Sequence, residues 1–168
     1  MCGFILTNYD INLDKQKKIL NHRGPDDSGL YSDKNIKIIF NRLSIIDLNS
    51  RSNQPFIYKD YILAFNGEIY NYIELRNILK KKFKFTTTSD TEVLLYSFIM
   101  WGKDCLNKFE GMFSFCIYNK KENSIFAARD RFGIKPIFFY KKNSKFIISS
   151  EKKAIFNIGV KKNLNQET

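Results

Sequence analysis

The chain contains short apolar runs bounded by polar residues, a spacing typical of β-strands. In the first part of the chain these runs predict strands at 4–9, 28–32, 36–41 and 61–65. Ahead of the second run, the segment HRGPDDSG at 22–29 is rich in Gly, Pro and Asp. Because these residues favour turns and interrupt regular structure, we expect a loop there.

Three other segments place their apolar residues three or four positions apart, which is the pattern of one helix face. They predict helices at 13–20, 71–82 and 90–101, and in the last of these Leu94 and Phe98 share a face. Such amphipathic helices are stable when they cover a sheet or one another.

The pattern then returns to strands, now in pairs. The runs at 112–118 and 124–130 flank one short polar turn, and those at 137–140 and 146–150 flank another. Paired runs of this kind predict hairpins, and hairpins imply antiparallel sheets. With a length of 168 residues, the chain is expected to form one domain of the α+β class, a layered sandwich covered by helices.

The chain is strongly basic, with 28 Lys and Arg residues against 17 Asp and Glu and a net charge of +11. Most of these cations are lysines, and many stand in clusters at 80–84, 119–123 and 140–145. Such clusters are typical of solvated turns, and no motif that reads RNA or DNA accompanies them. We therefore expect no specific nucleic-acid partner.

The three cysteines, Cys2, Cys105 and Cys116, are odd in number and lack the spacing of metal ligands. We expect neither a disulfide framework nor a metal site from them. No stretch of the sequence has the apolar length of a signal peptide core or a membrane span. The expectation is a cytoplasmic protein with reduced thiols and no membrane contact.

Cys2 stands between the initiator Met1 and Gly3. Removal of Met1 would leave Cys2 with both a thiol and a free α-amine, a nucleophile next to a base. A free cysteine often serves instead as a small apolar side chain, so its position alone leaves both interpretations open.

The dipeptide Asn66-Gly67, in LAFNGEIYNY, offers a side-chain amide and a glycine N–H. Two such donors suit a developing oxyanion, and glycine lets its N–H approach a substrate closely. The same dipeptide favours a type I′ hairpin turn. The residues that follow have helical rather than alternating spacing, which weakens the hairpin interpretation without removing it.

Two charged residues with apolar neighbours could hold a charged substrate. Arg42, in FNRLSIIDL, could bind a carboxylate through its guanidinium or form an internal ion pair. Asp90, in TTTSDTEVLL, could bind an ammonium group. It also lies in a predicted capping box, Ser89-Asp90-Thr91-Glu92, where acidic residues complement the helix dipole.

The only histidine, His22, lies in the predicted loop at 22–29 without a neighbouring cysteine. We interpret HRGPDD as part of the architecture on the substrate side of a site rather than as a catalytic base. The sequence has no glycine-rich phosphate loop, so it gives no support for ATP chemistry by these residues.

Seven motifs taken together resemble a known family. In chain order they are Cys2-Gly3, HRGPDDSG (22–29), RLSIIDL (42–48), FNGEIYNYIELR (65–76), SDTEVLL (89–95), EGMFSFCIY (110–118) and ARDRFGIKPIFFY (128–140). They resemble the glutaminase domain of glutamine-dependent asparagine synthetase, a class II glutamine amidotransferase among the N-terminal-nucleophile hydrolases. The resemblance runs from Cys2 to about Ala154.

The resemblance implies a four-layer αββα sandwich of antiparallel sheets. It implies that Cys2, after loss of Met1, is the nucleophile and that its own α-amine is the base. The side chain of Asn66 and the N–H of Gly67 would then form the oxyanion hole.

Three further residues acquire roles by the same resemblance. Arg42 would bind the α-carboxylate of glutamine, Asp90 its ammonium group, and Glu68 would line the pocket. The segment 128–136 would be architectural or lie near a domain boundary.

The implied reaction converts glutamine to glutamate and ammonia through a γ-glutamyl thioester on Cys2. The ammonia would pass to an ATP-dependent synthetase site, for asparagine synthesis from aspartate. This predicts a glutamine amidotransferase domain over 1–168, truncated before a C-terminal synthetase domain. The expected partners are glutamine and a fused or separate synthetase domain, with a homodimer left open. ATP and Mg²⁺ would serve the synthetase domain, and no cofactor is expected in this one.

Two alternatives remain from the sequence. The acceptor of the ammonia could be another molecule, such as a sugar or peptide precursor. If Met1 is retained, the base is acylated, and the chain would be a non-catalytic glutamine-binding module.

Overall fold

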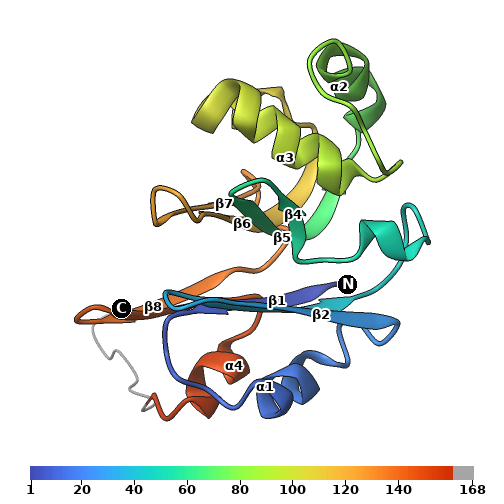
Figure 1. Cartoon of the computed structure of the whole chain (residues 1–168). Helices are drawn as coiled ribbons and strands as arrows, with labels where there is room; N and C mark the ends of the chain where they lie inside the picture. The colour runs from blue at the N-terminus through green and yellow to red at the C-terminus, as the bar shows by residue number, and fades with distance from the viewer. Residues whose placement is uncertain (161–168) are drawn as a thin grey trace.

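The computed structural model describes residues 1–160, which fold into four layers (Figure 1). Two antiparallel β-sheets lie face to face, and each carries a pair of helices on its outer surface. The predicted αββα sandwich of the α+β class is therefore confirmed.

The first sheet has five strands in the order β2-β3-β1-β9-β8. It joins the N-terminal part of the chain to the last hairpin. The strands are β1 (Gly3–Thr7), β2 (Asp27–Ser32), β3 (Lys37–Arg42), β8 (Phe138–Lys142) and β9 (Lys145–Ser149). Strand β1 lies in the middle, and its ladder with β3 begins at the pair Gly3 and Asn41. Cys2 thus immediately precedes a central strand.

The second sheet has four strands in the order β4-β5-β6-β7. They are β4 (Phe56–Tyr58), β5 (Tyr61–Ile69), β6 (Gly111–Asn119) and β7 (Ser124–Arg129). Strands β5 and β6 pair along their whole length, with Asn66 opposite Ser114 and Gly67 opposite Phe113. This long ladder fixes where the Asn66-Gly67 dipeptide lies.

Helices α2 (Tyr72–Leu79) and α3 (Asp90–Trp101) cover the second sheet, and α1 (Leu13–Leu20) and α4 (Lys152–Asn157) cover the first (Figure 1). Three apolar layers result, one beneath each pair of helices and one between the sheets. Side chains of β5 alternate between two of them, with Leu63 and Phe65 toward the helices and Ile62 and Ala64 toward the other sheet. By the same alternation, Asn66 and Glu68 face the space between the sheets.

Most predicted elements are confirmed, including the helix at 13–20 and both C-terminal hairpins. Strand β5 differs, because it continues past 65 to Ile69, and the helical spacing assigned to the next residues starts only at Tyr72. Four short elements were not predicted. They are β4, α4, and the 3₁₀ helices at Ser50–Ser52 and Gly102–Lys108.

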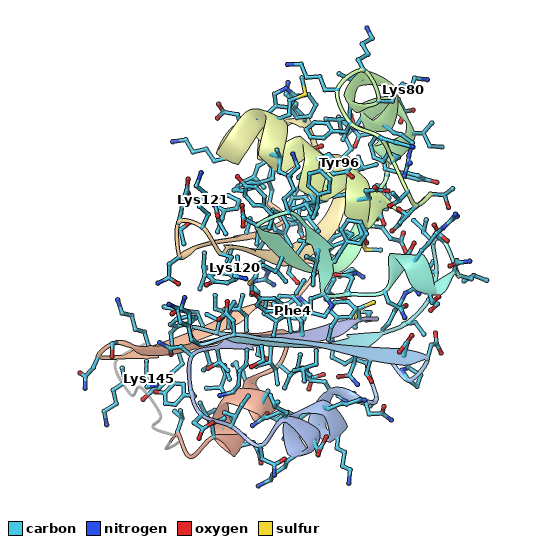
Figure 2. All side chains as sticks on the ribbon, in the orientation of Figure 1. Phe4, Lys80, Tyr96, Lys120, Lys121 and Lys145 are labelled. Carbon is cyan, nitrogen blue, oxygen red and sulfur yellow. The ribbon has the colours of Figure 1, made fainter. Side chains whose placement is uncertain are left out.

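The lysine clusters lie on the surface, as expected. Lys120 and Lys121 stand in the turn between β6 and β7, and Lys145 starts β9 after the next hairpin turn. Figure 2 shows these side chains directed outward, whereas Phe4 and Tyr96 lie inside the layers. Among residues 1–160, no helix has the length and apolarity needed to cross a bilayer.

Candidate functional site

A small pocket of about 40 Å³ lies beside Cys2, where the two sheets meet the loops that follow β3 and precede α3. Five of the candidate residues line it, and they come from four different parts of the fold. They are Cys2, Arg42, Gly67, Glu68 and Asp90. Residues far apart in the sequence are thus brought to one place.

Cys2 is half-buried, and its thiol contacts the backbone of Leu43. The Sγ atom lies 3.5 Å from the carbonyl oxygen of Leu43 and 3.4 Å from its N–H nitrogen. Burial raises the pKa of the Cys2 thiol above its usual value, and the Leu43 N–H offsets this only in part. The resting side chain is therefore a thiol, which needs a base to become a nucleophile.

The edge of β5 directs backbone N–H groups toward this pocket. The N–H of Phe65 donates to the side chain of Gln54 at 2.7 Å, and the N–H of Ile69 donates to Asp90 at 3.0 Å. Alternate residues of an antiparallel strand point their N–H groups to the same side. The N–H of Gly67 consequently points to the same side, between these two partners.

Asn66 lies next to the pocket without lining it. Its side chain is 1% exposed, and its amide nitrogen Nδ2 has no hydrogen-bond partner among the described residues. Leaving a buried donor unpaired costs roughly 1–3 kcal/mol. A donor kept in this state is available for a ligand.

Glycine is required at position 67 for a reason other than the one expected from the sequence. A Cβ atom there would lie 2.2 Å from the carbonyl oxygen of Met112 and 2.6 Å from the Cα of Phe113. The close approach is thus to the neighbouring strand β6, not to the pocket. The hairpin-turn interpretation of Asn66-Gly67 is also wrong, because both residues lie inside a continuous strand.

Arg42 is the last residue of β3 and is buried. Its Nη1 donates to the carbonyl of Asn49 and to Oδ1 of Asn53, and its Nη2 donates to the carbonyl of Asp47. These partners are neutral, so the internal ion pair considered from the sequence is not formed among the described residues. Three of the five guanidinium donors are used, which leaves Nε–H and one Nη2–H for a ligand.

Asp90 is the first residue of α3, and only 4% of it is exposed. Burial raises its pKa to about 6, although hydrogen bonds from the Ile69 N–H and the Ser89 hydroxyl lower it. The nearby Glu68 raises it further. A cation entering the pocket would therefore stabilise the ionised carboxylate of Asp90.

The predicted capping box is only half correct. Ser89 does cap the helix, since its Oγ accepts from the N–H of Thr91 at 3.1 Å. Glu92 does not reach back to Ser89. It accepts instead from the N–H groups of Thr86 and Thr87, because the chain before the helix folds over its carboxylate.

Three residues outside the sequence-based candidates hold the walls of the pocket. The carboxylate of Asp47 accepts from the N–H of Thr88 at 2.7 Å and so joins the loop after β3 to the start of α3. Arg76, from α2, donates to the carbonyl of Ser89 at 2.9 Å. The third is Gln54, which binds the edge of β5. Each bridges residues distant in sequence, so no local pattern could have identified it.

The HRGPDD segment lines no part of the pocket itself, but it supports the loop after β3 that does. The carboxylate of Asp26 accepts from the N–H of Ser44 in this loop at 2.7 Å, and Nε of Arg23 donates to the Cys2 carbonyl at 2.9 Å. His22 is largely exposed and contacts Glu151.

Asp130 confirms the architectural interpretation of 128–136. Its carboxylate accepts from the N–H groups of Phe113, Phe132, Ile134 and Lys135, at distances between 2.9 and 3.2 Å. One side chain thus fixes the turn that leads from β7 to β8.

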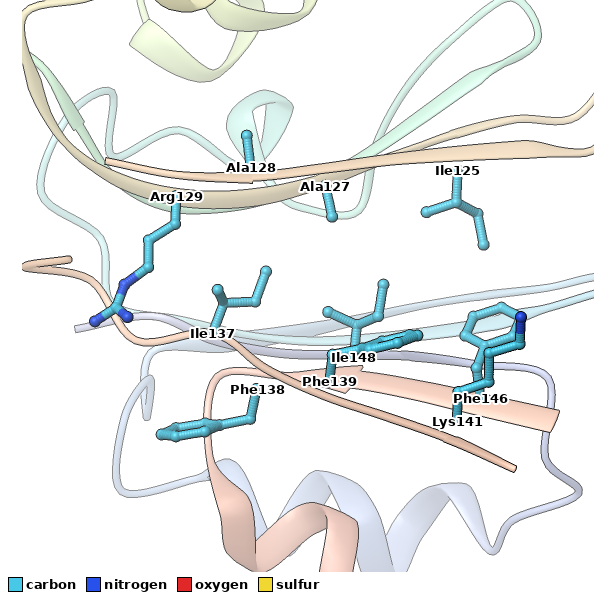
Figure 3. Close-up of a pocket in the computed structure, with 10 residues that line it drawn as sticks. All are labelled: Ile125, Ala127, Ala128, Arg129, Ile137, Phe138, Phe139, Lys141, Phe146 and Ile148. Carbon is cyan, nitrogen blue, oxygen red and sulfur yellow. The ribbon is translucent and has the colours of Figure 1, made fainter. Parts of the chain in front are cut away.

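A larger cavity of about 480 Å³ opens between the edge strands β7 and β8 (Figure 3). Ile125, Ala127, Ile137 and Ile148 are among its mainly apolar lining, and the cationic Arg129 is another lining residue. It contains none of the candidate catalytic residues, so its size does not make it the reactive site.

Comparison with known proteins agrees with this geometry. Residues 1–168 match a family model described as a glutamine amidotransferase domain. Asparagine synthetase [glutamine-hydrolyzing] 1 from Bacillus subtilis is 39% identical over a match that covers 92% of this chain and 26% of that protein. Asparagine synthetase [glutamine-hydrolyzing] 3 from the same organism is 41% identical, with 85% of this chain and 24% of that protein covered.

The fold is also that of a solved amidotransferase. The structure of glutamine phosphoribosylpyrophosphate amidotransferase from B. subtilis aligns with a TM-score of 0.79 at 20% sequence identity, covering 95% of this chain and 44% of that one. This likeness concerns the fold alone. The present chain spans about a quarter of the length of the two B. subtilis synthetases.

Proposed function

Because the chain belongs to the glutamine amidotransferase family, we propose that it hydrolyses glutamine to glutamate and ammonia with Cys2 as the nucleophile. One observation carries the proposal: the fold gathers Cys2, a cation and an acid in one pocket, next to two donors of β5. Each group matches one part of a glutamine molecule.

The charged ends of glutamine fit the two charged walls. Arg42 would take the α-carboxylate through its two remaining donors, which can act together on a carboxylate. Asp90 would take the α-ammonium group, which would favour its ionised form. Glu68 would line the pocket beside Asp90 and add to the attraction for the ammonium group.

The reaction needs the α-amine of Cys2, which becomes free when Met1 is removed. An α-amine has a pKa of roughly 7.7–8.0 and can accept the thiol proton near neutral pH. The sulfur would attack the side-chain carbonyl carbon of glutamine. The negative charge that forms on the carbonyl oxygen would be stabilised by Asn66 Nδ2 and the Gly67 N–H.

Collapse of this intermediate would break the carbon–nitrogen bond. The proton held by the α-amine would pass to the leaving nitrogen, and ammonia would depart. A γ-glutamyl thioester would remain on Cys2. Water, deprotonated by the same amine, would then cleave the thioester, release glutamate and restore the thiol.

The pocket must widen to admit glutamine. Its volume of about 40 Å³ is far below the roughly 300–1,000 Å³ typical of ligand pockets. The loop after β3 covers one side and carries Ile45, which is 60% exposed. Outward movement of this loop would open the site, and its return would enclose the bound glutamine.

The ammonia would pass to an ATP-dependent synthetase part, and asparagine formation from aspartate is the first choice because the similar proteins are named asparagine synthetases. A sugar or peptide precursor is the alternative acceptor. Within residues 1–160, no group of three His, Cys, Asp or Glu side chains could hold a metal ion. ATP and Mg²⁺ would serve the synthetase part, and no step proposed for this chain runs through them.

A surface for this synthetase part is proposed beside the larger cavity. Phe132, Ile134 and Phe139 are 89%, 56% and 63% exposed, and the backbone of the first two is held by Asp130. A rigid, exposed apolar turn of this kind is typical of an interaction site. The three cysteines are free, and a cytoplasmic location would keep the Cys2 thiol reduced.

The test is glutamine hydrolysis by the purified protein after complete removal of Met1. We expect equal amounts of glutamate and ammonia, complete loss of both in Cys2→Ala, and a loss of roughly 10²–10³-fold in kcat in Asn66→Ala. Cys116→Ala is the matched control, because that cysteine is fully buried in the core and lines no part of the pocket. Hydrolysis that persists in Cys2→Ala would contradict the proposal.

A further inference from the structure

Glu151 connects the C-terminal end of the described fold to the N-terminal nucleophile. It precedes helix α4, and its carboxylate is mostly buried. Its Oε1 accepts from Nη1 of Arg23 at 3.2 Å and lies 2.6 Å from Nε2 of His22, while Oε2 lies 3.1 Å from Nζ of Lys153. Of these partners, only Arg23 is buried.

Arg23 in turn holds the backbone of Cys2. Its Nε donates to the Cys2 carbonyl at 2.9 Å. Its side chain also runs along the start of β1, since its Cδ lies 3.1 Å from the place of a Cβ on Gly3. A neutralised and fixed guanidinium therefore lies against the residue that carries the reacting thiol.

Cys2 needs such an anchor because it lies outside the sheet. The ladder between β1 and β3 begins at Gly3, and the ladder between β1 and β9 begins at Ile5. The next part of the chain is fixed from the same side as Glu151, by two hydrogen bonds between Phe4 and Ser150. After Met1 is removed, the carbonyl of Cys2 is the backbone group through which the terminal residue can be held.

We propose that Glu151 is a positioning residue for the N-terminal nucleophile: it fixes the guanidinium of Arg23, which holds the Cys2 carbonyl and thereby orients the thiol and the α-amine. This proposal rests on the proposed function. Glu151 lines no part of the pocket, so it acts through Arg23 and touches neither glutamine nor the reacting atoms.

The arrangement also has an electrostatic consequence. Glu151 is compensated by His22, Arg23 and Lys153, and its own pKa lies below the usual range, because these hydrogen bonds outweigh its burial. The charged groups that act on Cys2 from the pocket side are Arg42 and Asp90. Removing the Glu151 charge would leave the guanidinium of Arg23 uncompensated at the Cys2 carbonyl. This positive charge at the same residue would favour the neutral, reactive form of the α-amine.

Three variants separate position from charge in Met1-free protein. Glu151→Ala removes both the contact and the charge, Glu151→Gln keeps an oxygen acceptor for Arg23, and Glu151→Asp keeps the charge. Asp10→Asn is the matched control, because it makes the same change of charge at a fully exposed carboxylate, which pairs with Lys37. Circular dichroism and a count of titratable Cys2 thiols give the folded fraction for each.

We expect Glu151→Ala to lose roughly 10- to 100-fold in kcat per folded site, with KM for glutamine changed less than about twofold because the pocket walls are intact. In Glu151→Gln the acidic limb of the pH–rate profile should move down by on the order of 0.5–1 unit. Glu151→Asp should keep the wild-type limb, and Asp10→Asn should match the wild type throughout.

The rate of Cys2 alkylation by iodoacetamide, followed against pH by peptide mass, reports on the same positioning without glutamine. If Met1-free wild type releases no ammonia, the proposed function fails, and the alkylation profile still decides the role of Glu151. An unchanged kcat per folded site in Glu151→Ala, or, where the wild type is inactive, alkylation profiles that coincide across all variants, would overturn the inference.

Discussion

At the scale of single residues, Asp90 is a residue of the candidate site whose ionised carboxylate lowers the stability of the folded chain. Its carboxyl is buried beside Glu68 at the start of α3, and its pKa is raised to about 6. A raised pKa means that the folded protein favours the protonated form. The contribution of protonated Asp90 to the stability of the folded chain is complete below the ordinary pKa of about 3.8, and it is lost as the pH rises through about 6.

Asp90→Asn is therefore expected to stabilise the folded chain near pH 8, by up to about 3 kcal/mol. The gain should shrink as the pH falls through 6 and vanish near 4, which urea unfolding at a series of pH values would measure. The same variant should raise KM for glutamine by on the order of 100-fold, because the ammonium loses its charged partner. Equal stability of variant and wild type at pH 8 would show that the carboxylate is not strained by burial.

Part of this residue-scale information can be obtained from the sequence. Cys2, Arg42, Glu68 and Asp90 were predicted from motifs that resemble a family, and the structure places all four at one pocket. The supporting residues could not be predicted. Glu151 and Arg23 are 128 positions apart, and a contact of that kind leaves no periodic or local signal.

At the scale of elements, a single acceptor can determine a whole turn. The turn after β7 is closed by the four N–H groups that donate to Asp130. Its glycine, Gly133, has a φ of +66°, a conformation that other residues adopt at a cost. This rigid turn carries the exposed side chains of Phe132 and Ile134.

Replacing Asp130 by Ala should lower the free energy of unfolding by roughly 2–3 kcal/mol, because buried N–H groups lose their acceptor. Urea unfolding provides the measurement. Asp10→Ala is the comparison, and it should leave the free energy of unfolding nearly unchanged because its side chain is fully exposed. A loss in Asp130→Ala no larger than in the comparison would mean that water replaces the carboxylate at this turn.

Sequence patterns predicted the long elements well and the short ones poorly. Helix α1 and the hairpins have clear periodicity, whereas β4 has three residues and α4 has six. Segments this short cannot show a period, and their structure comes from packing. Strand β5 extended further than predicted because its end depends on pairing with β6, which is a tertiary contact.

At the scale of the whole molecule, the four layers place the pocket where β1 begins and leave the edges of β7 and β8 open around the larger cavity. The exposed apolar turn lies between those two strands. We propose that this turn contacts a fused or separate synthetase part, because it is held rigid by Asp130 and exposes apolar side chains.

Phe132→Asp tests this assignment. In the present chain it should leave glutamine hydrolysis within about twofold, because Phe132 lies outside the pocket. With the synthetase part present, fused or separate, it should reduce glutamine-dependent product formation by roughly tenfold or more, while ammonia-dependent formation stays unchanged. Ile78→Asp, at an exposed apolar residue of α2, is the matched control and should leave both reactions coupled. Normal coupling in Phe132→Asp would show that this turn does not contact the synthetase part.

The most direct test of the central claim compares one protein preparation before and after removal of Met1. Methionine aminopeptidase would supply the second state, intact mass would establish it, and ammonia and glutamate would be measured in both. We expect no hydrolysis of glutamine while Met1 acylates the amine of Cys2, and equal amounts of ammonia and glutamate once Met1 is removed. Hydrolysis at the same rate in the Met1-containing protein would contradict this expectation.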